Sequence, residues 1–598
     1  MQILLSLRRI LAGLCGLVAL ALAAHPLTSQ TTGPQQLVFT GLLGSTNPAD
    51  PANAQFNAVQ SDASGNLYLL LDQKDGVRLL KTDPTATNVL AQTQLGAAGD
   101  IGVAMALDPS GNIYITGTTT SGAITATSGA AFPGPTGTST NAFIGKFDQN
   151  LNPIFITYAG SGGLSVTAIA ATADAVFITG SVFGSALPVT PSAIIQAPAS
   201  GSLQNGFVER FNANGTTLVY ATYLSGQNGN TAPAAIAADA IDNAYIAGYT
   251  TSSGYPTLNA LVPDILSPTS GFLTKLTPVA DGLIFSTFVP GPGITSIAID
   301  LAAQNLLLSG AIALGQFPIA TVSTPLVNTT YQTLLRLSFD GSTVISSTLL
   351  APGTQSTLTP AANQNTWIAT TLTNPAWLLP LTPLSTIGNS YALRVNQQNQ
   401  IDQTIRFGGL PTTNPTFASA PVTLASVTTD LTGTPIFAGS ASPTASASLL
   451  ATETYDLPSY NTPTPVLNSN LRAAVLSPAD CSGSLCSGAA AYLAKLSPTP
   501  APTLALSVDT SPNITLRNLG SVTATNLQLT ATNFTLASNC PTTLAPGAEC
   551  SIALTSTSTN PGTLTAQADN ATTQTATLAA TTTRPNPIAF SPKELDFG

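Results

Sequence analysis

The sequence predicts an all-β chain, a seven-bladed β-propeller followed by a β-sandwich. Three short, mostly apolar elements recur seven times each between Gln36 and Ser497, and this region has no sustained 3.6-residue apolar period. A Pro-rich break and a second set of alternating segments follow. A four-stranded antiparallel sheet repeated around a ring is a β-propeller, so seven copies predict seven blades.

Residues 1–24 have the features of a signal peptide. Arg8 and Arg9 form a positive start, Ile10–Ala24 is an apolar run of 15 residues, and Ala21-Leu22-Ala23 has the small-x-small form of a cleavage site. A membrane anchor is the alternative, but 15 residues are short for a hydrocarbon core of ~30 Å. We therefore expect a secreted, periplasmic or cell-surface protein with no membrane span in the mature chain.

The chain has few charges. Charged residues make up 7% of it, against roughly 25% in typical soluble domains. Removal of the signal peptide leaves 14 basic against 26 acidic residues, a formal charge of −12, with no basic stripe. Because sequence-independent nucleic-acid binding depends on Lys and Arg that neutralise phosphate, nucleic acid is not an expected partner.

Four cysteines remain in the mature chain, in two close pairs. Cys481 and Cys486 lie in CSGSLC, and Cys540 and Cys550 lie in NCPTTLAPGAEC. A structural zinc site needs about four ligands, whereas each pair stands alone and the only histidine, His25, lies at the cleavage region. Two local disulfides are the better interpretation, each contributing about 2–3 kcal/mol.

The first recurring element is an apolar run entered from a turn, as in DPSGNIYITG from Asp108. The turn slot holds Asp62, Asp108, Asp239 and Asp430, with Asp300 shifted by one and Ala171 and Ala361 in blades three and six. These carboxylates are either cation ligands or caps of a hairpin turn with glycine at positive φ. Replacement by alanine favours a structural turn.

The second element places a basic residue in the same slot of every copy. Seven of the 16 basic residues lie there: Lys81, Lys146, Arg210, Lys275, Arg336, Arg394 and Lys495. A ring of seven cations for an anionic polymer is one interpretation. The favoured one is structural, with each stem packed across a strand and each head at a neighbouring carbonyl or acid. Tyr68, Tyr114, Phe177 and Tyr245 are expected in the core rather than as a sugar-stacking platform.

The third element explains how the ring closes. It starts the propeller at Gln36 with no basic-slot strand before it, and the propeller ends on the basic-slot strand near Lys495. These two strands are therefore expected to share a blade, which leaves no sheet edge open at the closure. Residues 36–497 give about 66 residues per blade, against roughly 40–45 in a compact blade, so some connections are long. Several hold an apolar-Pro pair suited to an edge or loop, such as Phe132-Pro133, Leu187-Pro188 and Tyr255-Pro256.

The remaining chain divides into three parts. Residues 498–502 form a Pro-rich linker, and residues 503–583 hold short alternating segments that suggest a β-sandwich. Residues 584–598 have the pattern of a first strand of another sandwich without partner strands, which suggests a truncated product.

DPSGNIYITGTTTS, the TYLSG-type strand ends and the YPT-type turn resemble the bacterial SBBP β-propeller repeat, whose members are typically exported. FTLASNCPTTLAPGAECSIALTS resembles the immunoglobulin-like choice-of-anchor D domains, related to the Hydin type, although Thr557 stands where an aromatic is usual. The first resemblance implies location and shape more than chemistry.

No catalytic, cofactor-binding or metal-binding residues are predicted. The mature chain has at most His25, which excludes a Ser-His-Asp triad, and it has no G-x-S-x-G, Walker A or dinucleotide motif. We expect a monomeric, non-enzymatic binding or adhesion scaffold that presents propeller loops to an extracellular protein or glycan. The alternative is a Ca²⁺-dependent propeller enzyme, a glycan lyase, hydrolase or lactonase, with carboxylates from several blades at one mouth of the channel. A structural envelope protein is third.

Overall fold

The computed structural model describes residues 36–43, 55–313, 331–372, 390–407, 422–441, 490–497, 504–579 and 589–590, with gaps of at most four residues inside these ranges. Its regular elements in these ranges are strands, and they include no helix long and apolar enough to cross a membrane. The predicted signal peptide 1–24, Cys481 and Cys486, and the linker 498–502 lie outside the described residues.

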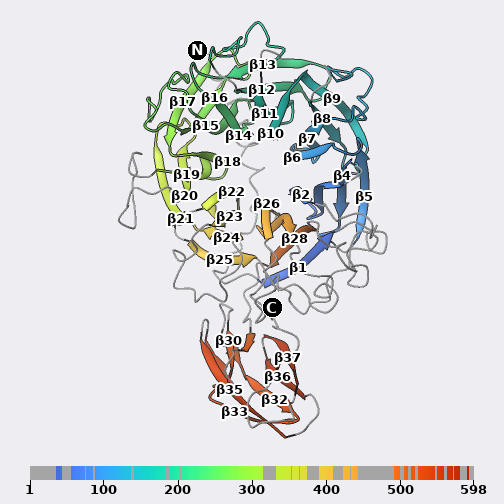
Figure 1. Cartoon of the computed structure of the whole chain (residues 1–598), viewed down its shortest axis with the longest axis vertical. Coiled ribbons are helices and arrows are strands. Elements are labelled where there is room, and N and C mark those ends of the chain that lie inside the picture. Colours follow the sequence, from blue (N-terminus) through green and yellow to red (C-terminus); the bar gives the residue numbers. More distant parts are fainter. Residues whose placement is uncertain are drawn as a thin grey trace, which may run out of the picture. The chain divides into compact units, whose positions relative to one another are not determined.

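Seven antiparallel four-stranded sheets form a β-propeller (Figure 1). Blades one to four are consecutive in sequence. Their strands are β2 (Gln55–Ser61), β3 (Leu67–Gln73), β4 (Gly76–Thr82) and β5 (Val89–Leu95); β6 (Ile101–Leu107), β7 (Ile113–Thr119), β8 (Asn141–Phe147) and β9 (Pro153–Gly162); β10 (Leu164–Ala171), β11 (Ala175–Val182), β12 (Asn205–Asn212) and β13 (Leu218–Leu224); β14 (Thr231–Ala238), β15 (Ala244–Thr250), β16 (Ser270–Leu276) and β17 (Leu283–Pro290).

Blades five and six follow the same order, and blade seven closes the ring. Their strands are β18 (Gly293–Asp300), β19 (Asn305–Ile312), β20 (Tyr331–Ser338) and β21 (Val344–Ala351); β22 (Gly353–Pro360), β23 (Thr366–Leu372), β24 (Ser390–Val395) and β25 (Ile401–Phe407); β26 (Val422–Thr429), β27 (Pro435–Ala441), β28 (Ala490–Ser497) and, from the start of the chain, β1 (Gln36–Leu43).

The closure joins the two ends of the propeller sequence in one sheet. Strand β1 pairs antiparallel with β28, with Phe39 opposite Lys495 and Gln36 opposite Ser497. The innermost strands β2, β6, β10, β14, β18, β22 and β26 contact their neighbours in a complete cycle, including β26 with β2 (Figure 1). The predicted seven blades and their shared closing blade are confirmed.

The innermost strand of each blade is the element that the three recurring motifs do not include. Each of these strands carries one β-bulge near its start, where an extra residue increases the local twist. The bulged residues are Asn57, Val103, Thr167, Ala234, Thr295, Thr354 and Ala425.

Apolar side chains between adjacent blades form the core. One cluster, for example, joins Tyr68 and Leu70 of blade one to Met105 and Ile115 of blade two. The strand aromatics expected in the core are fully buried: Tyr68, Tyr114, Phe177 and Tyr245. Burying aromatic and β-branched side chains on both faces of each blade is the main source of propeller stability.

The C-terminal segment contains two four-stranded sheets that share one apolar cluster. The first has the order β29 (Leu504–Val508), β30 (Asn513–Asn518), β35 (Glu549–Ser556), β33 (Phe534–Ser538), and the second β32 (Gln528–Thr532), β36 (Gly562–Ala568), β37 (Ala571–Ala579), β38 (Ala589–Phe590). A short pair joins β31 (Ala524–Thr525) and β34 (Thr543–Leu544). Ile514 and Ile552 of the first sheet belong to the same buried cluster as Leu564 and Ala566 of the second.

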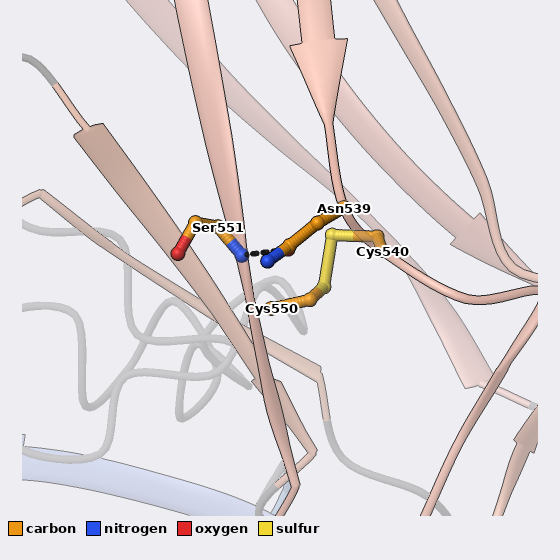
Figure 2. The surroundings of a disulfide bond; sticks show 4 residues. All are labelled: Asn539, Cys540, Cys550 and Ser551. Carbon is orange, nitrogen blue, oxygen red and sulfur yellow. Dashed lines mark hydrogen bonds between the residues drawn. A yellow bond between two sulfur atoms is a disulfide. The ribbon is translucent and has the colours of Figure 1, made fainter.

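The predicted disulfide between Cys540 and Cys550 is present (Figure 2). Beside it, the N–H of Ser551 donates to the side-chain oxygen of Asn539 at 2.7 Å, and the N–H of Asn539 donates to the Ser551 carbonyl at 3.2 Å. The disulfide therefore reinforces a point where the chain returns to β35.

One feature of the C-terminal segment differs from the sequence-based expectation. Residues 584–598 are predicted to begin another domain without partner strands. The two described residues of that stretch, Ala589 and Phe590, instead pair antiparallel with β37 and extend the second sheet.

Candidate functional site

The turn aspartates cap their own turns. The Asp62 Oδ1 accepts hydrogen bonds from the N–H groups of Ser64 and Asn66 at 2.8 and 2.9 Å, and its Oδ2 accepts one from the Asn66 side chain at 2.9 Å. Gly65 has φ +79°, the left-handed conformation that glycine adopts without strain. The same three bonds recur at Asp108 and Asp239. Short polar side chains favour turns through such bonds.

The basic slot lies beside the turn aspartate of the same blade. Lys81 Nζ is 3.7 Å from Asp62 Oδ2 and 5.2 Å from the centroid of the Tyr68 ring. It also donates to the carbonyl of Gln149, in the turn between β8 and β9 of the next blade, at 2.9 Å. We call this group of carboxylate, aromatic ring and cation the cation cluster. It joins two blades through one ammonium group.

The cation cluster recurs around the ring. Lys146 lies 3.4 Å from Asp108, 4.8 Å from the Tyr114 ring and 3.1 Å from the Ala213 carbonyl of blade three. Lys275 lies 3.5 Å from Asp239, 4.5 Å from the Tyr245 ring and 5.8 Å from the Phe339 ring of blade five. In blade seven Ile436 replaces the aromatic ring opposite the cation, and Lys495 lies 3.1 Å from Asp430 and 3.2 Å from the Pro84 carbonyl of blade one. The last contact spans the closure of the ring.

Blade three lacks the turn aspartate and obtains a carboxylate from its neighbour. The register places Thr172, rather than the predicted Ala171, in the aspartate slot: its N–H donates to the Ala175 carbonyl as the Asp62 N–H donates to the Asn66 carbonyl. Arg210 pairs with Asp242 in the turn of blade four. Asp242 has φ +66°, a position that glycine occupies in blades one and two, and it also accepts the Thr172 hydroxyl at 2.6 Å. The cation cluster is thus rebuilt across the blade boundary with the longer, forked arginine side chain.

Blades five and six keep the cation with different partners. Arg336 donates to the Gln364 carbonyl and the Thr366 hydroxyl of blade six at 3.0 and 3.1 Å. Burial lowers the pKa of its guanidinium, and the charge of Asp300 opposes that shift. In blade six, Arg394 lies 5.9 Å from the Trp367 ring.

The electrostatics of the cluster keep the tyrosine neutral and the aspartate ionised. Burial, followed by the charge of Asp239, raises the pKa of Tyr245 well above its usual value. Burial also opposes ionisation of Asp239, but hydrogen bonds from Asn243 and the charge of Lys275 outweigh it, so the pKa of Asp239 is lowered. The Tyr245 hydroxyl then serves as a neutral donor to Asp239, at 3.2 Å.

We expect Arg210→Met and Asp242→Gly to be strongly coupled. Each single change breaks a nearly buried pair and should lower the free energy of unfolding by about 2 kcal/mol, less the strain that glycine relieves at position 242. The double variant should lose at least about 1 kcal/mol less than the sum of the singles. Urea denaturation of the four proteins measures the coupling, and strict additivity would contradict the pairing.

The inner wall of the ring contains almost no charge. Of the seven innermost strands, only β18 carries a charged residue, Asp300 at its end. Polar side chains at the bulges instead join neighbouring blades: Thr167 donates to the Pro233 carbonyl at 2.9 Å and Thr295 to the Ser356 carbonyl at 2.7 Å. Within the described ranges, no three His, Cys, Asp or Glu side chains are grouped as metal ligands would be.

The described long loops between the second and third strands lie along the outermost strand of their own blade. In blade three, Thr190 donates its N–H to the Ala221 carbonyl and Tyr223 donates to the Ile195 carbonyl, at 3.2 and 3.1 Å. The Thr222 hydroxyl accepts the Ile195 N–H at 3.2 Å and lies 3.3 Å from its carbonyl. Thr157 makes the same two contacts with Phe132, and Thr287 with Val262. These loops cover a sheet edge.

The apolar-Pro pairs of blades two and three, Phe132-Pro133 and Leu187-Pro188, do not occupy equivalent positions. The Leu187 N–H donates to the Tyr223 hydroxyl at 3.3 Å, and the matching hydroxyl in blade two, Tyr158, donates to the Ile124 carbonyl at 2.7 Å. Ile124 therefore occupies the position of Leu187, and Phe132 is the residue held by the outer-strand threonine. The Phe132-Pro133 pair resembles the other pairs only in sequence.

A protein-family model supports the propeller. The model of the SBBP family, "Beta-propeller repeat", matches residues 93–122 and 219–256. No curated protein matches the chain. Among solved structures, the chain is similar to the WD40 β-propeller domain of Doa1 (TM-score 0.36, 11% identity, 68% of this chain and 93% of that chain) and to a chain of the mitotic checkpoint complex (TM-score 0.35, 7% identity, 69% and 91%). Two stretches of the seven-bladed propeller thus match the SBBP β-propeller repeat.

Proposed function

We propose that the protein is an exported, non-enzymatic binding or adhesion scaffold. Export rests on the signal-peptide features of residues 1–24 and on the low charge of the chain. A propeller gives a rigid framework whose connections vary without disturbing the core, which suits presentation of a binding surface. The protein acts as a monomer outside the cytoplasm, and its partner is an extracellular protein or a glycan.

The main support for a non-enzymatic role is that the recurring aspartates are occupied by contacts within the fold. The Ca²⁺-dependent enzyme needs carboxylates from several blades at one mouth of the channel. Asp62, Asp108 and Asp239 are each held by turn N–H groups, an asparagine side chain and the lysine of their own blade. The commonest charged motif of the chain therefore supports the fold, and it leaves binding to uncharged surface.

We further propose that the C-terminal segment is an immunoglobulin-like sandwich of the choice-of-anchor D kind that spaces the propeller from a surface. Two sheets with a common apolar cluster and the Cys540–Cys550 disulfide support this. The disulfide fits an oxidising compartment.

The full chain should bind at least one member of a glycan array or an array of extracellular proteins. Because the proposed surface is uncharged, raising NaCl from 0.05 to about 0.5 M should change the affinity less than about threefold. Chelation with EDTA should leave binding unchanged. Silence across both arrays would reject the proposal, and EDTA-sensitive cleavage of a glycan or lactone would favour the enzyme instead.

A further inference from the structure

The outermost strand of blade one differs from those of blades two to four. In blade one the connection between the second and third strands is only residues 74–75, so no long loop of its own covers β5. The burial of β5 alternates between half-buried and exposed until its last residue, and Leu90 is 53% exposed. By contrast, β13 and β17 are buried after their first two residues. In the described part of the chain, no strand pairs with β5 beyond β4.

Blade one nevertheless keeps the threonine that holds the loop in the other blades. Thr93 lies opposite Leu79 of the third strand, as Thr222 lies opposite Val208. Thr157 and Thr287 occupy the same register in blades two and four. Thr157, Thr222 and Thr287 are buried beneath the loop residues that they bind, whereas Thr93 is half-buried. The Thr93 hydroxyl on β5 can therefore accept a hydrogen bond from the main-chain N–H of a docked residue and donate one to the carbonyl of that same residue.

The next blade supplies another acceptor. In blades two and three, the loop residue before the threonine-bound one donates its N–H across the boundary: Ala131 to the Gly215 carbonyl and Ile194 to the Ala280 carbonyl, both at 2.9 Å. Gly215 and Ala280 are the left-handed residues of their turns, with φ +68° and +52°. Leu151, with φ +63°, is the equivalent residue of the blade-two turn that faces blade one.

We propose that the outer edge of blade one, formed by β5, Thr93 and the Leu151 carbonyl, docks an extended peptide segment of a partner polypeptide. The segment adds as a fifth strand, in the place that the loops occupy in blades two to four. Exposed edges bind peptides in this way, with main-chain hydrogen bonds providing affinity and side-chain pockets providing specificity.

The loops of this chain indicate the chemistry of the partner. The residue that meets the outer-strand threonine is bulky and apolar in each case, Phe132, Ile195 or Val262, and it is packed on the blade core. Strand β5 has the sequence VLAQTQL and no charged residue. The expected ligand is therefore an uncharged extended segment with a bulky apolar residue at its centre.

The inference deepens the proposed function, on which it rests, because it gives the binding scaffold a site. The test uses the full chain and a fluorescent synthetic peptide with the sequence of residues 254–265 in which asparagine replaces Asp264, GYPTLNALVPNI, so that the segment is uncharged. Fluorescence anisotropy should show saturable binding. Thr93→Val, which removes both hydroxyl contacts and keeps the shape, should weaken it about tenfold.

Two controls separate this site from general stickiness. Thr222→Val should leave the peptide affinity unchanged, because that hydroxyl is occupied by its own loop. On the unaltered protein, a peptide methylated on the backbone nitrogen of its valine should bind at least about tenfold more weakly, since it lacks the N–H that Thr93 accepts. The second control requires no variant to fold.

Three results would overturn the inference. The first is absence of peptide binding, and the second is equal affinity of the Thr93→Val protein and the original protein for the peptide. The third is a dimer of the original protein that Thr93→Val dissociates, because a second copy of the chain would then be the occupant of the edge. The arrays separate failure of this site from failure of the proposed function. If the Thr93→Val protein captures the same array partner as the original protein, the β5 site is rejected and the scaffold role stands.

Discussion

Replacing Lys146 by methionine is expected to lower the free energy of unfolding by about 3 kcal/mol. The side chains of Lys146 and Asp108 are only 9% and 3% exposed, so the change leaves a nearly buried carboxylate without its cation. It also removes the hydrogen bond to Ala213 and the ring contact with Tyr114. Methionine keeps most of the apolar stem, so packing loss is small. Urea denaturation followed by intrinsic fluorescence measures the effect.

The matched control is Lys146→Met combined with Asp108→Asn. The asparagine side-chain oxygen can still accept the turn N–H groups of Ser110 and Asn112, while the stranded charge is gone. The double variant should therefore recover at least about 1 kcal/mol relative to Lys146→Met alone. A loss below about 0.5 kcal/mol in the single variant would mean that the pair behaves as an exposed surface ion pair.

The residues of the cation cluster can be recognised in the sequence, but their pairing cannot. The aspartate and basic slots are both visible as repeats, yet they are separated along the chain by whole loops of variable length. Only the register brings them together: Tyr68 lies directly opposite Lys81 on the neighbouring strand, and Asp62 directly follows the last residue of β2. The recurring motifs predict the number of blades well, because each blade packs equivalent strands against its two neighbours.

Two kinds of feature could not be predicted from the repeat. The innermost strands, such as IGVAMAL and TAPAAIAA, are rich in small residues because they pack tightly around the ring, and this weakens the alternation that marks a strand. Contacts between blades form the other kind. The partnership of Arg210 with Asp242 depends on which turns lie side by side, and sequence spacing within one blade does not contain that information.

A buried carboxyl predicts an unusual dependence of stability on pH. Glu209 of β12 is fully buried, and burial raises its pKa to about 7 although the Gly160 N–H, 3.3 Å away, opposes the shift. Its other oxygen, Oε1, has no hydrogen-bond partner among the described residues. Its partners on the two neighbouring strands, Ile178 and Ala221, carry no charge. The folded protein therefore favours the protonated form.

Glu209→Gln should remove this dependence. Because the pKa in the folded state is raised above the ordinary 4.5, the proton-linked stabilisation is complete below about pH 4.5 and is lost as the pH rises to about 7. The lost stabilisation amounts to about 3 kcal/mol. The variant should match the original protein near pH 4 and exceed its free energy of unfolding by about 2–3 kcal/mol at pH 8.

Urea denaturation at pH 4, 5.5 and 8 tests this expected difference. The control is Asp264→Asn, at an exposed site, which should show no such trend. A constant difference between Glu209→Gln and the original protein across that range would mean that Glu209 has the same pKa in the folded and unfolded states, because contributions from the other titrating groups are common to both proteins and cancel.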